Sequence, residues 1–283
     1  MASARRLRSL STQVGAIRAA STLPGSQQTS YPKRKIFACG AGPPADSDWL
    51  REQIIEATGK PKPKVVWMGT PSYDGRQGAT GFAEAGLVVE WLNVTDMEAL
   101  PSPDAIAATL RSADIIQVSG GNTLFAVRRW RNLGIDKLLH EAMVRGCVLC
   151  GGSAGCICWF DGGHSDSLAP STVHPDYRRK LTEEERLDWS YCRVKGLGFV
   201  DAFCCPHHNQ HESHSTVSRA EHFDSMLRMS PGEVGIGVDN DACFIVEGDS
   251  WRGALRRATS VVPRSRTLAV APYPFALEEC SGE

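Results

Sequence analysis

The sequence has no long apolar run and almost no net charge. No stretch approaches the roughly 18 apolar residues that a membrane-crossing helix needs. The 31 Lys and Arg residues nearly balance the 32 Asp and Glu residues, which leaves a formal net charge of -1. That balance lacks the basic excess typical of nucleic-acid binding. We therefore expect a soluble protein with no membrane partner and no nucleic-acid partner, and the 283 residues favour one large domain.

The first part of the chain lacks acidic residues altogether. No Asp or Glu precedes Asp46, whereas basic residues are interspersed there with Ser, Thr and Ala. This composition is typical of an organellar transit peptide, and its arginines favour a mitochondrial over a plastid destination. The alternative is a disordered tail on a cytoplasmic protein. We assign residues 1–34 to this leader, residues 35–271 to the folded domain and residues 272–283 to a loose C-terminal tail.

A secretory signal is also absent, although the chain contains 10 cysteines. Most of them lie in apolar runs, as Cys39, Cys147, Cys150 and Cys243 do. In a reducing compartment, buried cysteines behave as small hydrophobic residues and disulfides are rare. We therefore assign these cysteines to packing rather than to cross-links.

Short apolar runs alternate with longer amphipathic stretches from Lys35 onwards. The pattern predicts strands at 35–39, 64–68, 88–92, 114–118 and 147–150, helices at 48–58, 81–85, 103–111 and 135–145, and another helix that ends at Arg131. Strands separated by helices are typical of α/β proteins, in which helices cover both faces of a largely parallel sheet. The polar segment 164–191 shows no period and is predicted as a long loop, and two further strands are expected at 235–239 and 242–246.

One of these strands leads into a serine set among small residues. Ser153 follows the apolar run 148–150, and Gly152 and Gly155 would relieve the crowding of a sharp strand-to-helix turn. A hydroxyl at the tip of such a turn can act as a nucleophile when a base, a group that holds the base and donors for the oxyanion lie nearby. The structural alternative is that Ser153 caps the following helix.

The candidate partners of Ser153 come from other segments. A strand ending at 203–205 would deliver His207 or His208 to the same edge of the sheet. The N–H of Ala154 and one from the turn at 120–121 are the candidate oxyanion donors. The carboxylates that could hold the base are Asp166, which is favoured by its closeness in sequence, Asp161 and Asp239.

Four groups of residues occur in a fixed order along the chain: 120–123; 152–155 with 158–160 and 163–167; 205–207; and 237–239. In order and spacing they resemble the peptidase E family of serine peptidases, whose relatives include aspartyl dipeptidases and cyanophycinases. The resemblance covers residues 35–246. It implies a three-layer α/β sandwich of the class I glutamine amidotransferase-like or flavodoxin-like kind, with no cofactor and no metal.

The resemblance also implies roles for individual residues. These are Ser153 as nucleophile, His207 as general base, the amides of Gly121 and Ala154 as the oxyanion hole, and Asp166 as the acid. Some relatives use a glutamate in the segment corresponding to 238–241, where this chain has Asn240, and this difference favours Asp166. Arg219 is the nearest counterpart of an arginine with which aspartyl dipeptidases hold the substrate's side-chain carboxylate.

These residues predict a serine exo- or dipeptidase that cleaves short peptides, with a preference for an N-terminal Asp. The alternative is a catalytically inactive relative that acts as a ligand-binding or interaction module, because the His-rich segment after His207 departs from the family pattern. Zinc binding by the Cys and His residues of 204–214 is a weaker hypothesis, since their spacing matches no closed site. Ser153 disfavours an amidotransferase-like glutaminase, which would carry Cys at that turn. Whether the protein forms a homodimer stays open.

Overall fold

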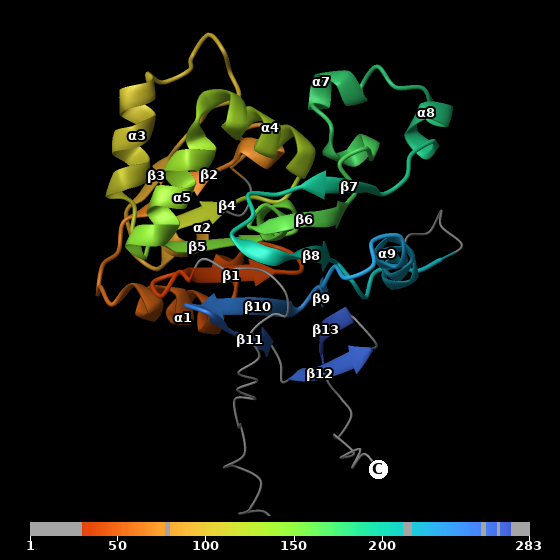
Figure 1. Ribbon diagram of the computed structural model, residues 1–283. Helices are drawn as coiled ribbons and strands as arrows, with labels where there is room; N and C mark the ends of the chain where they lie inside the picture. The colour runs from red at the N-terminus through yellow and green to blue at the C-terminus, as the bar shows by residue number, and fades with distance from the viewer. Residues whose placement is uncertain (1–29, 77–79, 212–216, 256–258, 265–266, 273–283) are drawn as a thin grey trace, which may run out of the picture.

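A seven-stranded sheet lies at the centre of the computed structural model, which describes residues 30–76, 80–211, 217–255, 259–264 and 267–272 (Figure 1). Across the sheet the strands are β11 (Ser250–Leu255), β10 (Ala242–Glu247), β1 (Lys35–Cys39), β5 (Val148–Gly152), β4 (Ile115–Val118), β2 (Val65–Met68) and β3 (Val89–Trp91). The strands from β1 to β3 in this order run parallel, whereas β10 and β11 are antiparallel to their neighbours. Parallel strands direct their carboxyl ends to one edge, where sites in α/β folds collect.

A second sheet has six strands and shares the centre of the molecule with the first. Its order is β12 (Thr259–Arg264), β13 (Thr267–Pro272), β9 (Gly235–Val238), β8 (Val200–Pro206), β6 (Phe160–Ser165) and β7 (Cys192–Lys195). The four inner strands are parallel, and β7 and β12 are antiparallel edges. Because β6, β8 and β9 are parallel, the residues that follow Ser165, Pro206 and Val238 meet at one end of this sheet.

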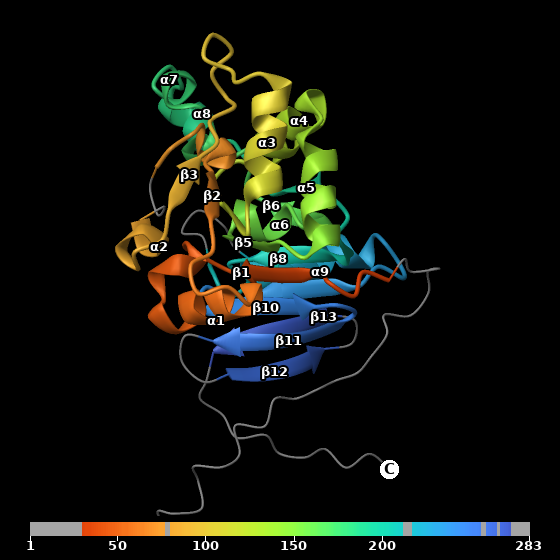
Figure 2. The same ribbon diagram turned by 90° about the vertical axis from the view of Figure 1, so that its left-hand side faces the viewer.

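Helices cover both faces of the first sheet. They are α1 (Asp48–Thr58), α2 (Thr80–Glu84), α3 (Pro103–Ser112), α4 (Thr123–Leu133) and α5 (Ile135–Arg145). Four shorter or later helices follow in the chain: α6 (Ala154–Ile157), α7 (Pro175–Arg178), α8 (Glu183–Leu187) and α9 (Arg219–Arg228). Single 3-10 turns lie at Pro44–Asp46, Thr70–Ser72 and Pro170–Thr172. Glycines in the left-handed conformation end α1 at Gly59 and separate α4 from α5 at Gly134. Figure 2 shows α3 and α5 on one side of the parallel strands, and α1 and α2 on the other.

The alternation of side chains along β1 explains the two layers. Ile36 and Ala38 belong to the core that α3, α4 and α5 cover. Phe37 and Cys39 point the other way, into the core that α1 covers. A buried strand with apolar residues on both faces is typical of parallel sheets, and burial of a large apolar side chain stabilises the fold by roughly 1.5–3 kcal/mol.

The α/β fold, the first five predicted strands and the predicted helices are therefore confirmed. The second sheet is the part that the pattern did not predict. Strands are found close to the predicted 235–239 and 242–246, but β9 belongs to the second sheet and β10 to the first. The turn at Asn240 and Asp241 therefore crosses between the two sheets.

The prediction of one long loop at 164–191 is wrong in part. His164 and Ser165 complete β6, and the segment then forms α7 and α8. Both helices are only one turn long, so neither could produce a helical period in the sequence. A capping box at Thr182 starts α8: its hydroxyl accepts from the N–H of Glu185, and the Glu185 carboxylate accepts from the N–H of Thr182.

The predicted leader and tail fall mostly outside the described residues, which begin at Ser30 and end at Pro272. At the described N-terminal end, Arg34 is buried and donates hydrogen bonds to the carbonyls of Phe199, at 2.6 Å, and Gly248, at 2.8 and 3.0 Å. Among the described helices, none combines the length and apolar character that crossing a bilayer requires.

Candidate active site

Ser153 stands on a strained turn between β5 and α6. Its φ of 57° and ψ of -113° are rare for a residue with a side chain. Gly152 and Gly155 permit the turn, because a Cβ on either would overlap a carbonyl oxygen, that of Gly42 or of Val118. The Ser153 hydroxyl does not cap α6, which removes the structural alternative for this residue. A partly exposed hydroxyl on such an elbow is positioned to act as a nucleophile.

The end of β1 holds the main chains of Ser153 and His207. The N–H of Ser153 donates to the carbonyl of Cys39 at 3.1 Å, and the N–H of His207 donates to the carbonyl of Gly40 at 3.2 Å. Cys39 lies opposite Gly152 in the parallel pairing of β1 and β5. His207 reaches this point from the end of β8 in the second sheet, with a φ of 52°. Two successive carbonyls thus bring the predicted nucleophile and base to one strand end.

The Ser153 hydroxyl forms no hydrogen bond to His207 within the described residues. Hydrogen bonds between catalytic groups are often long or poorly aligned before a substrate binds and tighten in its complex. The shared anchoring on β1 is therefore the relationship between these two residues that the structure records.

Of the two predicted oxyanion donors, Gly121 lies on a turn beside Ser153 and Ala154 is next to Ser153 in the chain. Gly120 lies next to it, since a Cβ on Gly120 would be 3.5 Å from that of Ser153. Gly121 has a φ of 124° and packs so closely on the carbonyl of Pro71 that a side chain would not fit. Within the described part of the chain, no carbonyl accepts the N–H of Gly121 or of Ala154. Both predicted amides are thus available to an oxyanion.

Asn240, and not Asp166, holds the ring of His207. The His207 Nδ1 lies 2.6 Å from the Asn240 Oδ1. An amide oxygen accepts a hydrogen bond, so in this contact the imidazole carries its proton on Nδ1, and Nε2 is the ring nitrogen that would accept a proton from a nucleophile. In the sequence, Asn240 counted only as a departure from relatives with a glutamate there, and its contact with His207 was not predicted. The signal that could have found it was its position where some relatives carry a glutamate.

His208 forms a second imidazole pair directly beside the first. Its Nδ1 lies 3.3 Å from Oδ1 of Asp239, which is buried. The ring of His208 packs on Gly237, where any Cβ would collide with it, and meets Phe223 edge-on at 6.0 Å between ring centroids. Consecutive histidines therefore bind consecutive residues of the β9–β10 turn, and the carboxylate partners His208 rather than the predicted base.

Asp166 and Arg219 pair with each other. The Arg219 Nη1 lies 3.7 Å from the Asp166 Oδ2, and the guanidinium lies over Tyr191 at 4.8 Å from its centroid. Arg219 is only 1% exposed and donates a 3.4 Å hydrogen bond to the carbonyl of His164. Both predicted residues are thus found together at the end of β6, where Asp166 neutralises Arg219.

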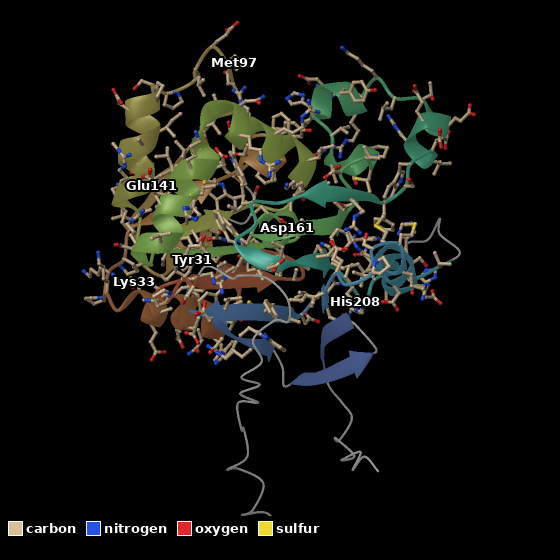
Figure 3. The ribbon with its side chains drawn as sticks, in the orientation of Figure 1. Tyr31, Lys33, Met97, Glu141, Asp161 and His208 are labelled. Atoms are coloured by element: carbon tan, nitrogen blue, oxygen red, sulfur yellow. The ribbon has the colours of Figure 1, made fainter. Side chains whose placement is uncertain are left out.

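Asp161, the other carboxylate left open, lies at the start of β6. Phe160 pairs with Val200 at the beginning of β8, whereas His207 follows the end of β8. Asp161 is therefore at the opposite end of the second sheet, and Figure 3 shows it well apart from His208.

A pair of histidines, one buried and one half-buried, lies beside Arg219. His164 is fully buried, and its Nε2 lies 3.0 Å from the Nδ1 of His222. Burial, aided by the charge of Arg219, lowers the pKa of His164 to about 2, so its ring stays neutral. Within the described residues no group of three or more Cys, His, Asp or Glu side chains is arranged to hold a metal ion. His214, part of the zinc hypothesis, lies outside the described residues.

A serine on a strand-to-helix elbow of an α/β fold is an arrangement typical of hydrolases. The comparison with protein families makes this specific: the model of peptidase family S51 matches residues 45–253, which is most of the chain. The chain belongs to this family, the peptidase E family, as the sequence motifs predicted.

Of two similar proteins, one carries a name that supports the assignment. An uncharacterized peptidase of Bacillus subtilis, YgaJ, is 28% identical over 180 residues, which cover 62% of this chain and 69% of that protein. A Trypanosoma brucei brucei protein named G2/mitotic-specific cyclin-1 is 27% identical over 241 residues, 76% of this chain and 69% of that protein. That single name does not outweigh a family match over most of the chain.

A solved structure supports the fold. A Listeria monocytogenes protein described as a peptidase E superposes with a TM-score of 0.54 at 19% identity, over 78% of this chain and 98% of that one. At this identity the similarity establishes the architecture alone. The peptidase assignment therefore depends on the family match.

Proposed function

We propose that this protein is a serine peptidase that cleaves short peptides with Ser153 as nucleophile, His207 as general base and Asn240 as the residue that orients the base. The anchoring of Ser153 and His207 on the successive carbonyls of Cys39 and Gly40, at the end of β1, carries the proposal. The strained elbow supports it, and so do the amides of Gly121 and Ala154, whose N–H groups no carbonyl in the described part of the chain accepts, because acyl transfer needs such donors.

The reaction follows from these groups. The Ser153 Oγ attacks the scissile carbonyl while its proton passes to the His207 Nε2, and the amides of Gly121 and Ala154 bind the oxyanion. Collapse of the tetrahedral intermediate breaks the C–N bond, and the amine leaves with the proton from His207. Water then loses a proton to His207, attacks the acyl group and restores the Ser153 hydroxyl when the acid departs.

A preference for an N-terminal Asp would need a cation that the substrate can reach. Arg219 is the candidate, but its buried guanidinium already pairs with Asp166. A substrate carboxylate would have to displace Asp166 or share the arginine with it. We therefore propose that selectivity for an N-terminal Asp requires Asp166 to move away from Arg219. Asp166→Asn removes the competing charge, so this variant should strengthen the preference for an Asp-Xaa dipeptide.

Covalent labelling tests the nucleophile. A fluorophosphonate probe reacts with an activated serine, so the wild-type protein should be labelled and Ser153→Ala should not. Ser225→Ala, on the exposed face of α9, is the control for removal of a hydroxyl and should label as the wild type does. A folded protein that resists the probe would overturn the proposed activity.

The alternative function, a non-catalytic binding module, is favoured by one observation: the base is held by a neutral amide where relatives use an acid. Hydrolysis of dipeptides separates the two functions. The peptidase hypothesis predicts turnover of Asp-Xaa or neutral dipeptides that His207→Ala reduces by several orders of magnitude. Binding of a peptide without any turnover, in a protein with an unlabelled Ser153, would support the module.

A further inference from the structure

Three arginines line a groove on the segment that connects β6 to β7, which we call the β6–β7 connection. The groove has a volume of about 290 Å³ and is lined by Pro170, Ser171, Arg178, Arg179 and Arg186. We call it the arginine groove. It lies on the segment that carries α7 and α8, which projects beyond β7 (Figure 1).

The charges of the arginine groove are mostly uncompensated. Arg179 pairs with Asp176 at 3.1 Å, but within the described residues no acidic side chain pairs with Arg178 or Arg186. Arg186 instead donates a 3.4 Å hydrogen bond to the carbonyl of Arg178, which ties α8 to α7. The nearby Glu185 is turned to the N-terminus of its own helix, where it caps Thr182. Guanidinium groups that have no carboxylate partner, as those of Arg178 and Arg186 in the described residues, are suited to bind an oxyanion from outside the chain.

The first residues of the β6–β7 connection are hydrogen-bonded to the rim of the candidate active site. The Asn122 side-chain amide donates to the carbonyl of Ser167 at 2.9 Å and to the hydroxyl of Thr172 at 3.4 Å. Asn122 directly follows the turn of Gly120 and Gly121, and Gly120 lies against Ser153. Farther along, His174 packs edge-on against Tyr73, at 5.0 Å between ring centroids. A ligand in the arginine groove would therefore lie on the element that borders the oxyanion side of the site.

Apolar side chains on the β6–β7 connection favour a peptide over a small anion as the ligand of the groove. Leu168, Tyr177 and Leu187 are 51%, 58% and 65% exposed. A free phosphate would use the guanidinium groups and leave these side chains without contacts. An acidic peptide could use both, with its carboxylates on the arginines and its aliphatic or aromatic residues on the apolar surface.

We propose that the arginine groove binds acidic side chains of the peptide substrate at positions away from the scissile bond. Substrates that reach the groove would be peptides rich in Asp or Glu and longer than a dipeptide. This proposal rests on the proposed peptidase function for its purpose, but the binding it describes can be measured separately.

The test measures binding in the full chain carrying Ser153→Ala, which cannot cleave by the proposed route. Isothermal titration calorimetry would compare a hexapeptide with Glu at alternate positions and its Gln counterpart, at low salt. We expect at least about ten-fold tighter binding of the Glu peptide, which matches several exposed ion pairs of up to about 1 kcal/mol each. Arg178→Gln with Arg186→Gln should remove most of that difference, and raised salt should weaken it.

A matched control replaces Arg111 and Arg228, two exposed arginines of α3 and α9, by Gln and should leave the difference intact. Equal binding of the two peptides, or a difference that survives the groove variant, overturns the proposal. So does inorganic phosphate that binds as tightly as the Glu peptide, because the site would then be one for small anions. An unlabelled Ser153 together with groove-dependent binding would overturn the peptidase function and leave the groove as a site for acidic peptides.

Discussion

Ser153 and His207 donate their main-chain N–H groups to successive carbonyls, those of Cys39 and Gly40, although 54 positions of sequence separate them. One residue comes from the first sheet and the other from the second. Their relative position therefore depends on how the two sheets meet at the end of β1. Changes at that junction should alter both stability and reactivity.

Gly40 is the residue on which this junction depends. A Cβ there would overlap the carbonyl oxygen of Asp239. Because backbone rather than a flexible side chain blocks the space, Gly40→Ala should lower the free energy of unfolding by about 2–4 kcal/mol and slow fluorophosphonate labelling of Ser153 at least ten-fold. Urea unfolding and labelling rates check both outcomes.

The control for Gly40→Ala is Gly86→Ala. Gly86 has a φ of 80° with no atom within 4 Å of an added Cβ, so only backbone strain of about 1–2 kcal/mol applies. It should label at the wild-type rate. Normal stability and labelling in Gly40→Ala would show that the two sheets can shift apart without harm to the site.

Asn240 should set the efficiency of the base. Asn240→Leu removes the acceptor for the Nδ1 proton of His207, so the tautomer and ring orientation are lost and kcat/KM should fall about 100-fold or more. Asn240→Glu supplies a carboxylate that stabilises the imidazolium formed during acyl transfer, so kcat/KM should rise. The rise should appear in kcat and not in KM, as expected of an interaction made in the transition state.

Dipeptide kinetics with all three proteins measure this effect. Asp166→Ala is the comparison, because Asp166 contacts Arg219 instead of His207. A loss in Asp166→Ala as large as that in Asn240→Leu would return Asp166 to the role that the sequence analysis gave it.

His164 should make the protein less stable in acid. Its folded-state pKa of about 2 lies below the ordinary value of 6.5, because burial penalises the charged ring. Between these values the unfolded chain binds a proton that the folded chain does not, so stability falls as pH falls below about 6.5. From pH 6.5 to 5 the loss attributable to His164 is about 2 kcal/mol. Burial lowers the pKa of His222, and the charge of Arg219 lowers it further, so His222 adds to this loss of stability in acid.

Urea unfolding at several pH values measures this slope. His164→Phe keeps the ring volume without a titrating group, so its slope between pH 6.5 and 5 should be shallower than that of the wild type. An unchanged slope would show that His164 does not contribute to the acid sensitivity.

The sequence predicts the elbow well because the elbow is local. Gly152 and Gly155 are needed within two residues of Ser153, and the preceding strand is a plain apolar run, so the motif and its reason lie in one short segment. The turns that carry the amides of Gly121 and Ala154 are local in the same way, and the role of these amides as oxyanion donors stays a prediction.

The partner of His207 was harder to predict because it depends on tertiary structure. Asp166 is nearer in sequence to the elbow, but β6 ends beside α9 and directs Asp166 to Arg219. Asn240 reaches His207 only because the β9–β10 turn passes between the two sheets. No hydrophobic period or motif spacing in the sequence indicates that the chain crosses from one sheet to the other at this turn.

The N-terminal limit of the folded domain gives a final prediction. The sequence pattern places it at Lys35, but the buried Arg34 binds two carbonyls from distant parts of the chain, those of Phe199 and Gly248. Removal of a buried guanidinium leaves those carbonyls without donors, so Arg34→Ala should lower the free energy of unfolding by about 2–4 kcal/mol. A protein starting at Lys35 should be destabilised by a similar amount relative to one starting at Ser30.

Lys33→Ala, at an exposed neighbouring position, is the control and should change stability by less than about 0.5 kcal/mol. Equal melting temperatures for the two truncations would place the limit of the domain after Arg34.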